Sequence, residues 1–388
     1  MPTDRPAPLT ESFYRARVAA TRAAVRDAGL DGLLCLDLHD VIYLSGFFHS
    51  PSERPVGLFV PLEGEPTLFV PLLEREHAQE GWVAHVETYE EFPGETHPVA
   101  WMVGRCGVAR LGVDALDWRI AESLRASGAD VRPCDAVERL RWIKTPAELA
   151  LVRAAARFAD RCLEHVLDEA GDIARQGGSE IDILQAALAA TEADMEVVLG
   201  RAFAGTTTRV VGTLHTGPRA ALPHGRTSLR VPQRGDVLIA GIGVAIGGYH
   251  AESGSTFVFG EPSADQRRCL LAADACDRAA ALACRPGARG DEVNERGLAE
   301  LRAAGLGDAI RHRIGHGMGI QGHESPWLAP GGDTPIEAGM VFSNEPGIYR
   351  PGTDGYRTIN SMIVTDDGVE VPSRFQAEHA PLERILAL

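Results

Sequence analysis

Histidines and carboxylates that could do chemistry gather in three short stretches of the C-terminal half, at residues 222–225, 314–326 and 339–349. The first contains His224, the second holds His316 and His323 seven residues apart among four glycines and a proline, and the third includes Glu345. Glycines let backbone and side chains approach a bound group closely. An isolated histidine would favour a locally hydrogen-bonded loop, but this combination predicts parts of one site.

The elements that must position these side chains follow from hydrophobic patterns. Apolar, glycine-rich runs predict strands over 236–243, 250–259, 339–345 and 362–365, and helical spacing predicts helices over 181–194 and 264–284. Thr145 followed by Pro146 is a strong helix start, because threonine caps and proline suits the first turn. We therefore expect the three polar stretches to lie on strands or at strand ends.

The first third of the chain has a different pattern. Residues 11–28 are amphipathic, while residues 32–38 and 41–43 are apolar runs that we interpret as extended. Residues 56–61 and 67–71 flank a turn-rich connection that predicts adjacent strands, and shorter strand signals lie at 109–113 and 130–133. This alternation predicts an α/β layer structure. The change of character near residue 140 predicts a boundary between two domains, for which the chain is long enough.

Residues 141–148, Arg-Trp-Ile-Lys-Thr-Pro-Ala-Glu, resemble the R-x-I-K-[TS]-x-x-E pattern that opens the catalytic domain of the creatinase, prolidase, aminopeptidase P and methionine aminopeptidase family. Gly-His-Gly-Met-Gly at 315–319 and Gly-Met-Val-Phe-Ser-Asn-Glu-Pro-Gly-Ile-Tyr at 339–349 resemble two further motifs of that family. The resemblance implies an α/β (α+β) protein with an N-terminal creatinase-like α/β domain, residues 1–140, and a C-terminal pita-bread domain, residues 141–388. It also implies a homodimer.

Active metallopeptidases of this family hold two divalent ions with two Asp, one His and two Glu. His316 and Glu345 match the histidine and the first glutamate, and Glu252 stands at the second aspartate position. Gly241 replaces the first aspartate and Ile359 replaces the last glutamate. The resemblance thus implies that two of the five ligands are lost.

Losing two carboxylates removes most of the negative charge that would hold a second cation, so we expect no dinuclear centre and no cofactor. One divalent ion remains open as an alternative, since many catalytic zinc sites have three protein ligands. Its ligands would then be Glu252, His316 and Glu345.

Creatinase is the family precedent for hydrolysis without metal, with a histidine as acid and base. Histidine exchanges a proton near neutral pH, as that role requires. We therefore predict a metal-independent hydrolase that cleaves a C–N bond in a small amino-acid-like, amidino or guanidino substrate. The predicted catalytic residues are His224 as the acid/base group, with His316, His323 and Glu345.

Glu252 is predicted to bind positive charge on the substrate, while Arg357 and Arg54 are candidates to clamp a substrate carboxylate. The structural alternative for both arginines is an ordinary salt bridge. Two other functions stay open: an Xaa-Pro-type peptidase with a single metal ion, and a non-catalytic binding protein that keeps the pocket.

Composition restricts the partners. With 54 acidic and 38 basic residues the formal charge is −16, and such a field repels nucleic acid and anionic lipid. The seven cysteines are scattered without a C-x-x-C pair, and neither a signal peptide nor a membrane span is evident. We expect a cytoplasmic enzyme whose partner is a dipeptide or another small molecule.

Overall fold

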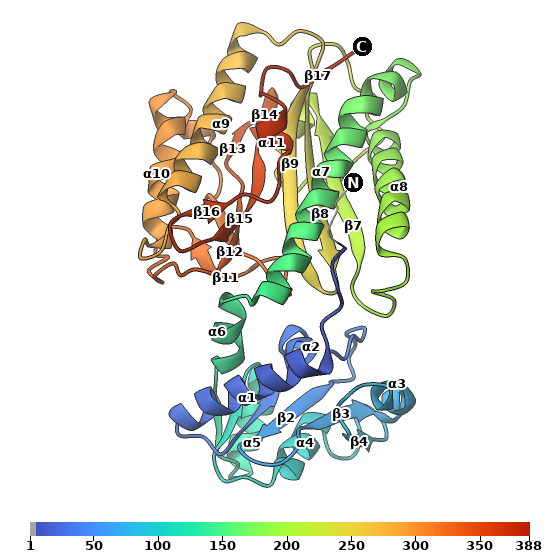
Figure 1. The fold of residues 1–388 in the computed structure, drawn as a ribbon, viewed down its shortest axis with the longest axis vertical. Coiled ribbons are helices and arrows are strands. Elements are labelled where there is room, and N and C mark those ends of the chain that lie inside the picture. Colours follow the sequence, from blue (N-terminus) through green and yellow to red (C-terminus); the bar gives the residue numbers. More distant parts are fainter. Residues whose placement is uncertain (1–4) are drawn as a thin grey trace. The chain divides into compact units, whose positions relative to one another are not determined.

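The structure, a computed structural model, describes residues 5–388 and divides the chain into two compact units (Figure 1). One unit is Leu9–Arg141. The other is Trp142–Leu388, which is joined by the segment that ends at Pro8. Each unit has its own sheet and its own helices. The mixed α/β fold class predicted from the sequence is confirmed.

The N-terminal unit is built on a six-stranded sheet with the order β4-β3-β2-β1-β5-β6. Strand β1 pairs antiparallel with β2 and parallel with β5, so the sheet is mixed. Buried side chains of β1, β3 and α4 such as Leu34, Phe69 and Met102 pack together in its core. The strands are β1 (Gly32–Cys35), β2 (Gly57–Pro61), β3 (Thr67–Pro71), β4 (His85–Tyr89), β5 (Leu111–Val113) and β6 (Val131–Pro133).

The prediction of extended structure at residues 41–43 is wrong. These residues lie in a helix, α2, which begins after Asp37, whose carboxylate accepts hydrogen bonds from the amides of His39 and Asp40. A short buried apolar run is compatible with either a strand or a helix, and here the Asp37 cap favours the helix. The helices of this unit are α1 (Glu11–Asp27), α2 (Leu38–Ser45), α3 (Arg75–Gln79), α4 (Pro98–Cys106), α5 (Trp118–Ala126) and α6 (Ala136–Trp142), whose last residue belongs to the second unit, with a 3-10 turn η1 (Leu72–Glu74).

The second unit is built on a nine-stranded sheet whose main path is β11-β10-β12-β15-β9-β8-β7; β16 pairs with β15 and β17 with β9. A separate hairpin joins β13 and β14. The strands are β7 (Arg209–Thr216), β8 (Val237–Ile246), β9 (Tyr249–Phe259), β10 (Gly315–Gly317), β11 (Glu324–Leu328), β12 (Val341–Asn344), β13 (Gly347–Arg350), β14 (Asp354–Arg357), β15 (Ile359–Val364), β16 (Val369–Glu370) and β17 (Ile385–Leu386).

Two helix pairs flank this sheet, α7 with α8 and α9 with α10 (Figure 1). Helix α7 packs on β8 and β9 and begins with a capping box, in which Thr145 and Glu148 satisfy each other's backbone amides. The helices are α7 (Pro146–Arg175), α8 (Glu180–Leu199), α9 (Ala264–Ala283), α10 (Gly290–Ala303) and α11 (Phe375–Glu378), with 3-10 turns η2 (Gly217–Ala221) and η3 (Gly307–Ala309).

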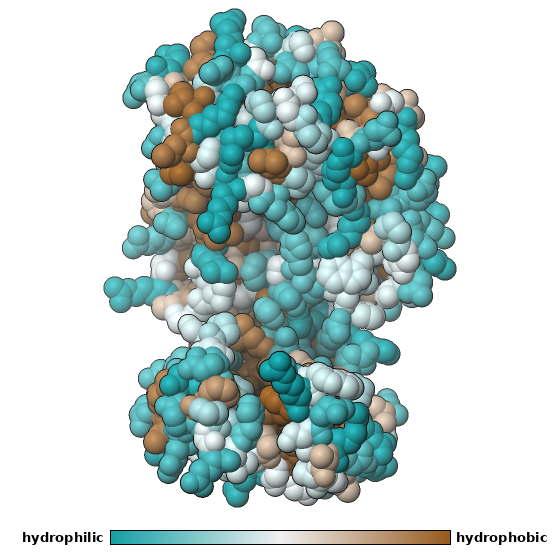
Figure 2. All heavy atoms as spheres, turned by 180° about the vertical axis from the view of Figure 1, so that it is seen from behind, coloured by the Kyte–Doolittle hydropathy of each residue, from teal (hydrophilic) through white to brown (hydrophobic). Residues whose placement is uncertain are grey.

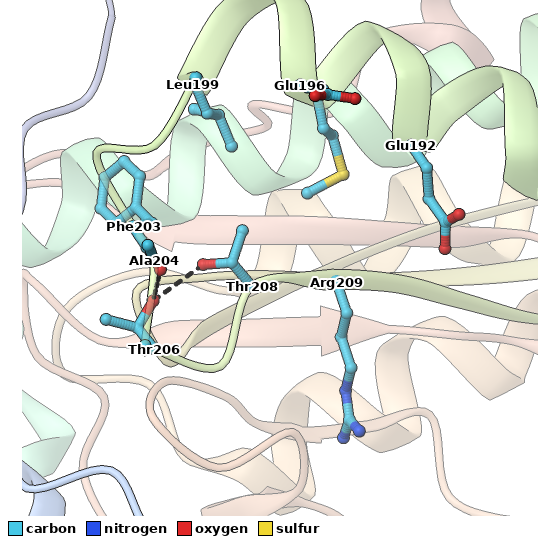
Figure 3. Close-up of a pocket in the computed structure, with 11 residues that line it drawn as sticks. Glu192, Glu196, Leu199, Phe203, Ala204, Thr206, Thr208 and Arg209 are labelled. Carbon is cyan, nitrogen blue, oxygen red and sulfur yellow. Dashed lines mark hydrogen bonds between the residues drawn. The ribbon is translucent and has the colours of Figure 1, made fainter. Parts of the chain in front are cut away.

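The surface is mainly polar, with apolar side chains scattered among charged ones on the face drawn in Figure 2. Leu229, Leu282 and Val197 are the most exposed large apolar side chains of the described residues. A cavity of about 480 Å³ opens between the end of α8 and the start of β7 (Figure 3). None of the predicted site residues lines it. Within residues 5–388 no helix is long and apolar enough to cross a membrane.

Candidate functional site

Strand order brings the separated polar stretches together. Strands β10, β12, β15 and β9 are consecutive neighbours in the sheet, although they come from distant parts of the sequence. His316 of β10 lies opposite Ser343 of β12, and Glu345 follows directly after that strand. Glu252 stands on β9. The sheet therefore carries one histidine and two carboxylates of the predicted set toward a common point.

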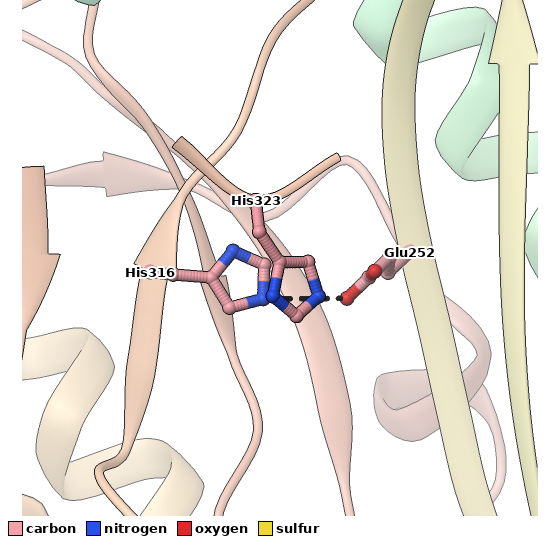
Figure 4. Close-up of side chains that lie close together, drawn as sticks. All are labelled: Glu252, His316 and His323. Atoms are coloured by element: carbon pink, nitrogen blue, oxygen red, sulfur yellow. Dashed lines mark ion pairs between the residues drawn. The ribbon is translucent and has the colours of Figure 1, made fainter. Parts of the chain in front are cut away.

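His316 is the centre of this arrangement. Its side chain is completely buried, and its Nε2 atom lies 3.5 Å from Oε1 of Glu345 and 4.0 Å from Oε2 of Glu252. Figure 4 shows the imidazole directed toward Glu252. The other ring nitrogen, Nδ1, lies 3.0 Å from the carbonyl oxygen of Gly317, whereas Nε2 has no hydrogen-bond partner among residues 5–388.

The tautomer of His316 follows from these contacts. A carbonyl oxygen only accepts, so Nδ1 carries the hydrogen, and Nε2 of the neutral ring presents a lone pair. That lone pair faces two carboxylates, which are also acceptors. Such a cluster is stable only when a proton or a cation lies among these atoms, because a buried polar atom without a partner is costly.

His323 completes the cluster from the loop between β10 and β11. Its ring stacks on that of His316 with centroids 3.8 Å apart and an angle of 22° between the planes (Figure 4). One ligand atom from each of Glu252, His316 and His323 lies within 4.8 Å of the others. The sequence predicted Glu345 as the third ligand of a single ion, whereas the compact group that the structure forms contains His323.

The two carboxylates are held differently. Oε2 of Glu252 accepts a hydrogen bond of 2.9 Å from the Ser343 hydroxyl, which fixes its orientation. Burial is the largest cause that raises the pKa of Glu345; the nearby Glu252 charge acts in the same direction, and a protonated His316 would oppose it. Glu345 is therefore suited to accept a proton closer to neutral pH than an exposed glutamate is.

Gly241 and Ile359 occupy the positions where the resemblance places two further carboxylates. Gly241 lies opposite Gly254 in the sheet, and Gly254 pairs with Ile359. The Cδ1 atom of Ile359 would stand 2.6 Å from a Cβ at Gly254 and 3.4 Å from one at Gly241. The isoleucine thus fills the space above both glycines.

Arg357, on β14, lies beside Gly241. It is 7% exposed, and its Nη1 donates to the carbonyl oxygen of Pro223 at 3.2 Å. A Cβ at Gly241 would lie 2.7 Å from Nη2 of this arginine. His224 is exposed and lies close to His312, whose pKa is lowered mainly by burial and to a smaller extent by Arg357 and His224. The predicted roles of Arg357 and His224 stay predictions.

Arg54 belongs to the N-terminal unit. Its guanidinium pairs with Glu91 at 2.7 Å and with the neighbouring Glu53. These ion pairs agree with the structural alternative given for it from the sequence, and its predicted contact with substrate stays a prediction.

Sequence reasoning missed Ser343, Tyr349 and His312. Nε2 of His312 lies 2.9 Å from the Tyr349 hydroxyl. Ser343 and Tyr349 lie within the motif at 339–349, in which only Glu345 matches a metal ligand of the family. His312 precedes the Gly-His-Gly string and carries no sequence signal of its own.

Comparison with known proteins identifies the family of this chain. The profile of Metallopeptidase family M24 matches residues 150–366, and that of the Creatinase/Prolidase N-terminal domain matches residues 17–143. A probable dipeptidase PepE of Mycobacterium bovis is 31% identical over 92% of this chain and 93% of its own length. An Xaa-Pro dipeptidase of Lactobacillus delbrueckii subsp. lactis is 29% identical over 89% of this chain and 93% of its own.

Solved structures of similar fold agree with this family assignment. The dipeptidase PepE of Mycobacterium ulcerans has a TM-score of 0.83 at 28% identity, covering 98% of this chain and 100% of that one. The N-terminal domain of the FACT complex subunit SPT16 from chickpea has a TM-score of 0.77 at 12% identity, over 97% of this chain and 99% of that one, a likeness of fold alone. The family and the creatinase-like two-domain fold predicted from the sequence are confirmed, and the chain belongs to metallopeptidase family M24.

Proposed function

We propose that the chain is a peptidase of dipeptide-sized substrates that works with one divalent cation, held by Glu252, His316 and His323. This is the alternative from the sequence analysis with a changed ligand set. The relatives' names, probable dipeptidase and Xaa-Pro dipeptidase, support a short peptide as substrate.

The observation that carries the proposal is the unpartnered Nε2 of His316. This buried lone pair faces Glu252 and Glu345 and has His323 stacked beside it. Two imidazoles and a carboxylate fit zinc or iron(II), which accept nitrogen and oxygen ligands and leave positions open. The donor set therefore suits a single ion.

The protein's own residues have defined tasks in this proposal. A bound divalent ion would polarise the scissile carbonyl group and lower the pKa of a water molecule. The Gly317 carbonyl keeps His316 in the tautomer that presents Nε2, and Ser343 orients Glu252. Glu345, with its raised pKa, accepts a proton during hydrolysis and can return it to the leaving amine.

Metal content and dipeptide hydrolysis test the proposal together. We expect protein purified without added salts to bind one equivalent of zinc, manganese or iron, and a chelator to abolish turnover. His316→Ala should lose both metal and activity, while His85→Ala, an exposed histidine of the other unit, should retain both. Binding of no metal by the wild type would refute the proposal.

A second candidate is the metal-independent C–N hydrolase predicted from the sequence. The specific observation in its favour is Arg357, a buried permanent cation beside Gly241, at a place where the resemblance implies metal-binding carboxylates. In that case turnover persists in chelator and His224→Ala abolishes it. If turnover persists in chelator and the His224→Ala variant is as active as the wild type, His224 is not the acid/base group.

A further inference from the structure

Lys144, from the motif at residues 141–148, has its charged end buried inside the unit that holds the candidate site. Its side chain is 2% exposed, and Nζ lies 2.9 Å from Oε1 of Glu324, whose side chain is 4% exposed. A second contact runs beside this ion pair, because Nε1 of Trp142 donates to the Ser325 hydroxyl at 2.8 Å. The segment that leads into α7 is therefore tied to the start of β11.

The place of Glu324 in the chain connects this ion pair to the site. Glu324 directly follows His323, whose ring stacks on that of His316 with centroids 3.8 Å apart (Figure 4). His323 itself is exposed and belongs to the loop between β10 and β11. Fixing an exposed side chain costs conformational entropy, so the stacking persists only if the loop that carries the ring is held in place.

The loop is held from two sides. On one side the Gly319 carbonyl oxygen accepts a hydrogen bond of 2.8 Å from the His250 amide of β9. On the other side the ion pair lies directly against the loop backbone. A Cβ at Gly319 would stand 2.6 Å from Oε1 of Glu324 and 2.7 Å from Cε of Lys144. The close approach of the loop to the ion pair therefore requires glycine at this position.

Stability alone does not explain a buried ion pair at this place. Desolvation of the two charges offsets much of their attraction, and apolar residues of similar volume are often equally stable there. Either charge left alone in the interior is strongly unfavourable, so the carboxylate stays where the ammonium is. The backbone of Lys144 is fixed in turn, since its amide donates to the Gly339 carbonyl oxygen at 3.0 Å. The pair therefore determines the position of Glu324 and of the residue before it.

We infer that Lys144 is a positioning residue for His323 and acts through its ion pair with Glu324. The pair holds the loop so that a ligand atom of His323 lies within 4.8 Å of those of Glu252 and His316. The inference rests on the proposed function in one respect, namely that this arrangement completes a metal site. The positioning itself is a property of the metal-free protein.

NMR spectra of protein with isotope-labelled histidine, recorded in chelator, test the positioning without metal. The signals of His323 are those that disappear in His323→Gln, and stacking on His316 moves its ring protons upfield. We expect Lys144→Met and Gly319→Ala to shift these signals toward those of an exposed histidine such as His85. His323 signals that stay in place in either variant would overturn the inference.

Two matched controls accompany these variants. Gly319→Ala keeps both charges and disturbs only their contact with the loop; Gly322→Ala changes the same loop where the nearest atom is Cδ2 of His250 at 3.7 Å. Arg153→Met breaks a half-exposed ion pair with Glu370 in the same unit. Both controls should leave the His323 signals unchanged. A shift in either control as large as in the test variants would show that the loop responds to any perturbation, and the inference would fail.

A double variant separates positioning from a purely structural role. Lys144→Met together with Glu324→Met replaces the pair by apolar side chains and leaves no lone buried charge. We expect its melting temperature to return close to that of the wild type, while zinc affinity stays about tenfold or more below the wild-type value. If zinc affinity recovers together with the melting temperature, the pair is structural only and the inference is overturned.

Failure of the proposed function gives a different pattern of results. If the wild type binds no zinc, the metal proposal fails, and the spectra in chelator still decide whether Lys144 positions His323. If zinc binds and the His323 signals do not respond to the variants, the metal proposal stands and the positioning role is wrong.

Discussion

His316 gains its chemical character from atoms that surround it. The Gly317 carbonyl sets the tautomer, and Ser343 turns one oxygen of Glu252 toward the ring. Such supporting contacts around metal ligands commonly contribute one to two orders of magnitude in affinity. The seven-residue spacing of His316 and His323 predicted proximity but not the stacking of the two rings, because that depends on the path of the intervening loop.

Ser343→Ala tests the supporting contact. Without the hydroxyl, Glu252 loses its orientation, and we expect zinc affinity to fall roughly 10- to 100-fold. Titration calorimetry with zinc measures the change, and Ser127→Ala in the N-terminal unit is the control. An unchanged dissociation constant would show that Ser343 does not support a ligand.

Restoring the two replaced carboxylates is a second test at this scale. Gly241→Asp together with Ile359→Glu should raise metal affinity sharply and increase the stoichiometry toward two. Gly241→Asp alone should not, since the new carboxylate would meet Arg357 first. Elemental analysis of the single and double variants distinguishes these results. If the double variant binds no more metal than the wild type, Gly241 and Ile359 do not occupy the two ligand positions assigned to them.

The elements were predictable where local signals are strong. The cap at Thr145, the helical spacing of 181–194 and 264–284 and the glycine-rich strands at 236–243 and 250–259 all correspond to observed elements. The order of strands β10, β12, β15 and β9 was not predictable from one sequence, because pairing between distant segments leaves no periodic pattern. The site's geometry depends on that order.

Helix α7 also contains a buried carboxyl group that predicts a pH effect. Asp160 accepts hydrogen bonds from the Ser253 hydroxyl and the Arg374 amide, and burial raises its pKa to about 7 from 3.8. The folded state therefore holds this proton more tightly than the unfolded state. The free energy of unfolding falls as pH rises from 3.8 to about 7 and changes no further above that.

Asp160→Asn removes this dependence and can keep both contacts. Relative to the wild type, the variant should be more stable at about pH 8 than at about pH 5, by on the order of 2 kcal/mol. Urea unfolding at both pH values measures the difference. Asp168→Asn, exposed on the same helix, is the control. An equal offset at the two pH values would contradict the assignment.

At the scale of the whole molecule, the candidate site lies within one of the two compact units. Every residue of the His316 cluster, and Arg357, belongs to the unit formed by 142–388. A ligand that binds only the folded form stabilises the unit that holds it. Two compact units of this kind are expected to unfold in separate transitions, because two-state behaviour belongs to single domains.

Scanning calorimetry with zinc therefore tests where the ion binds. At a zinc concentration about 100-fold above the dissociation constant, stabilisation is about 2.7 kcal/mol, which raises the transition of the larger unit by roughly 5 to 10 °C. The transition of the unit formed by 9–141 should not move. His316→Ala should lose the shift while keeping both transitions. A shift that persists in that variant, or that affects the N-terminal unit, would place the ion elsewhere.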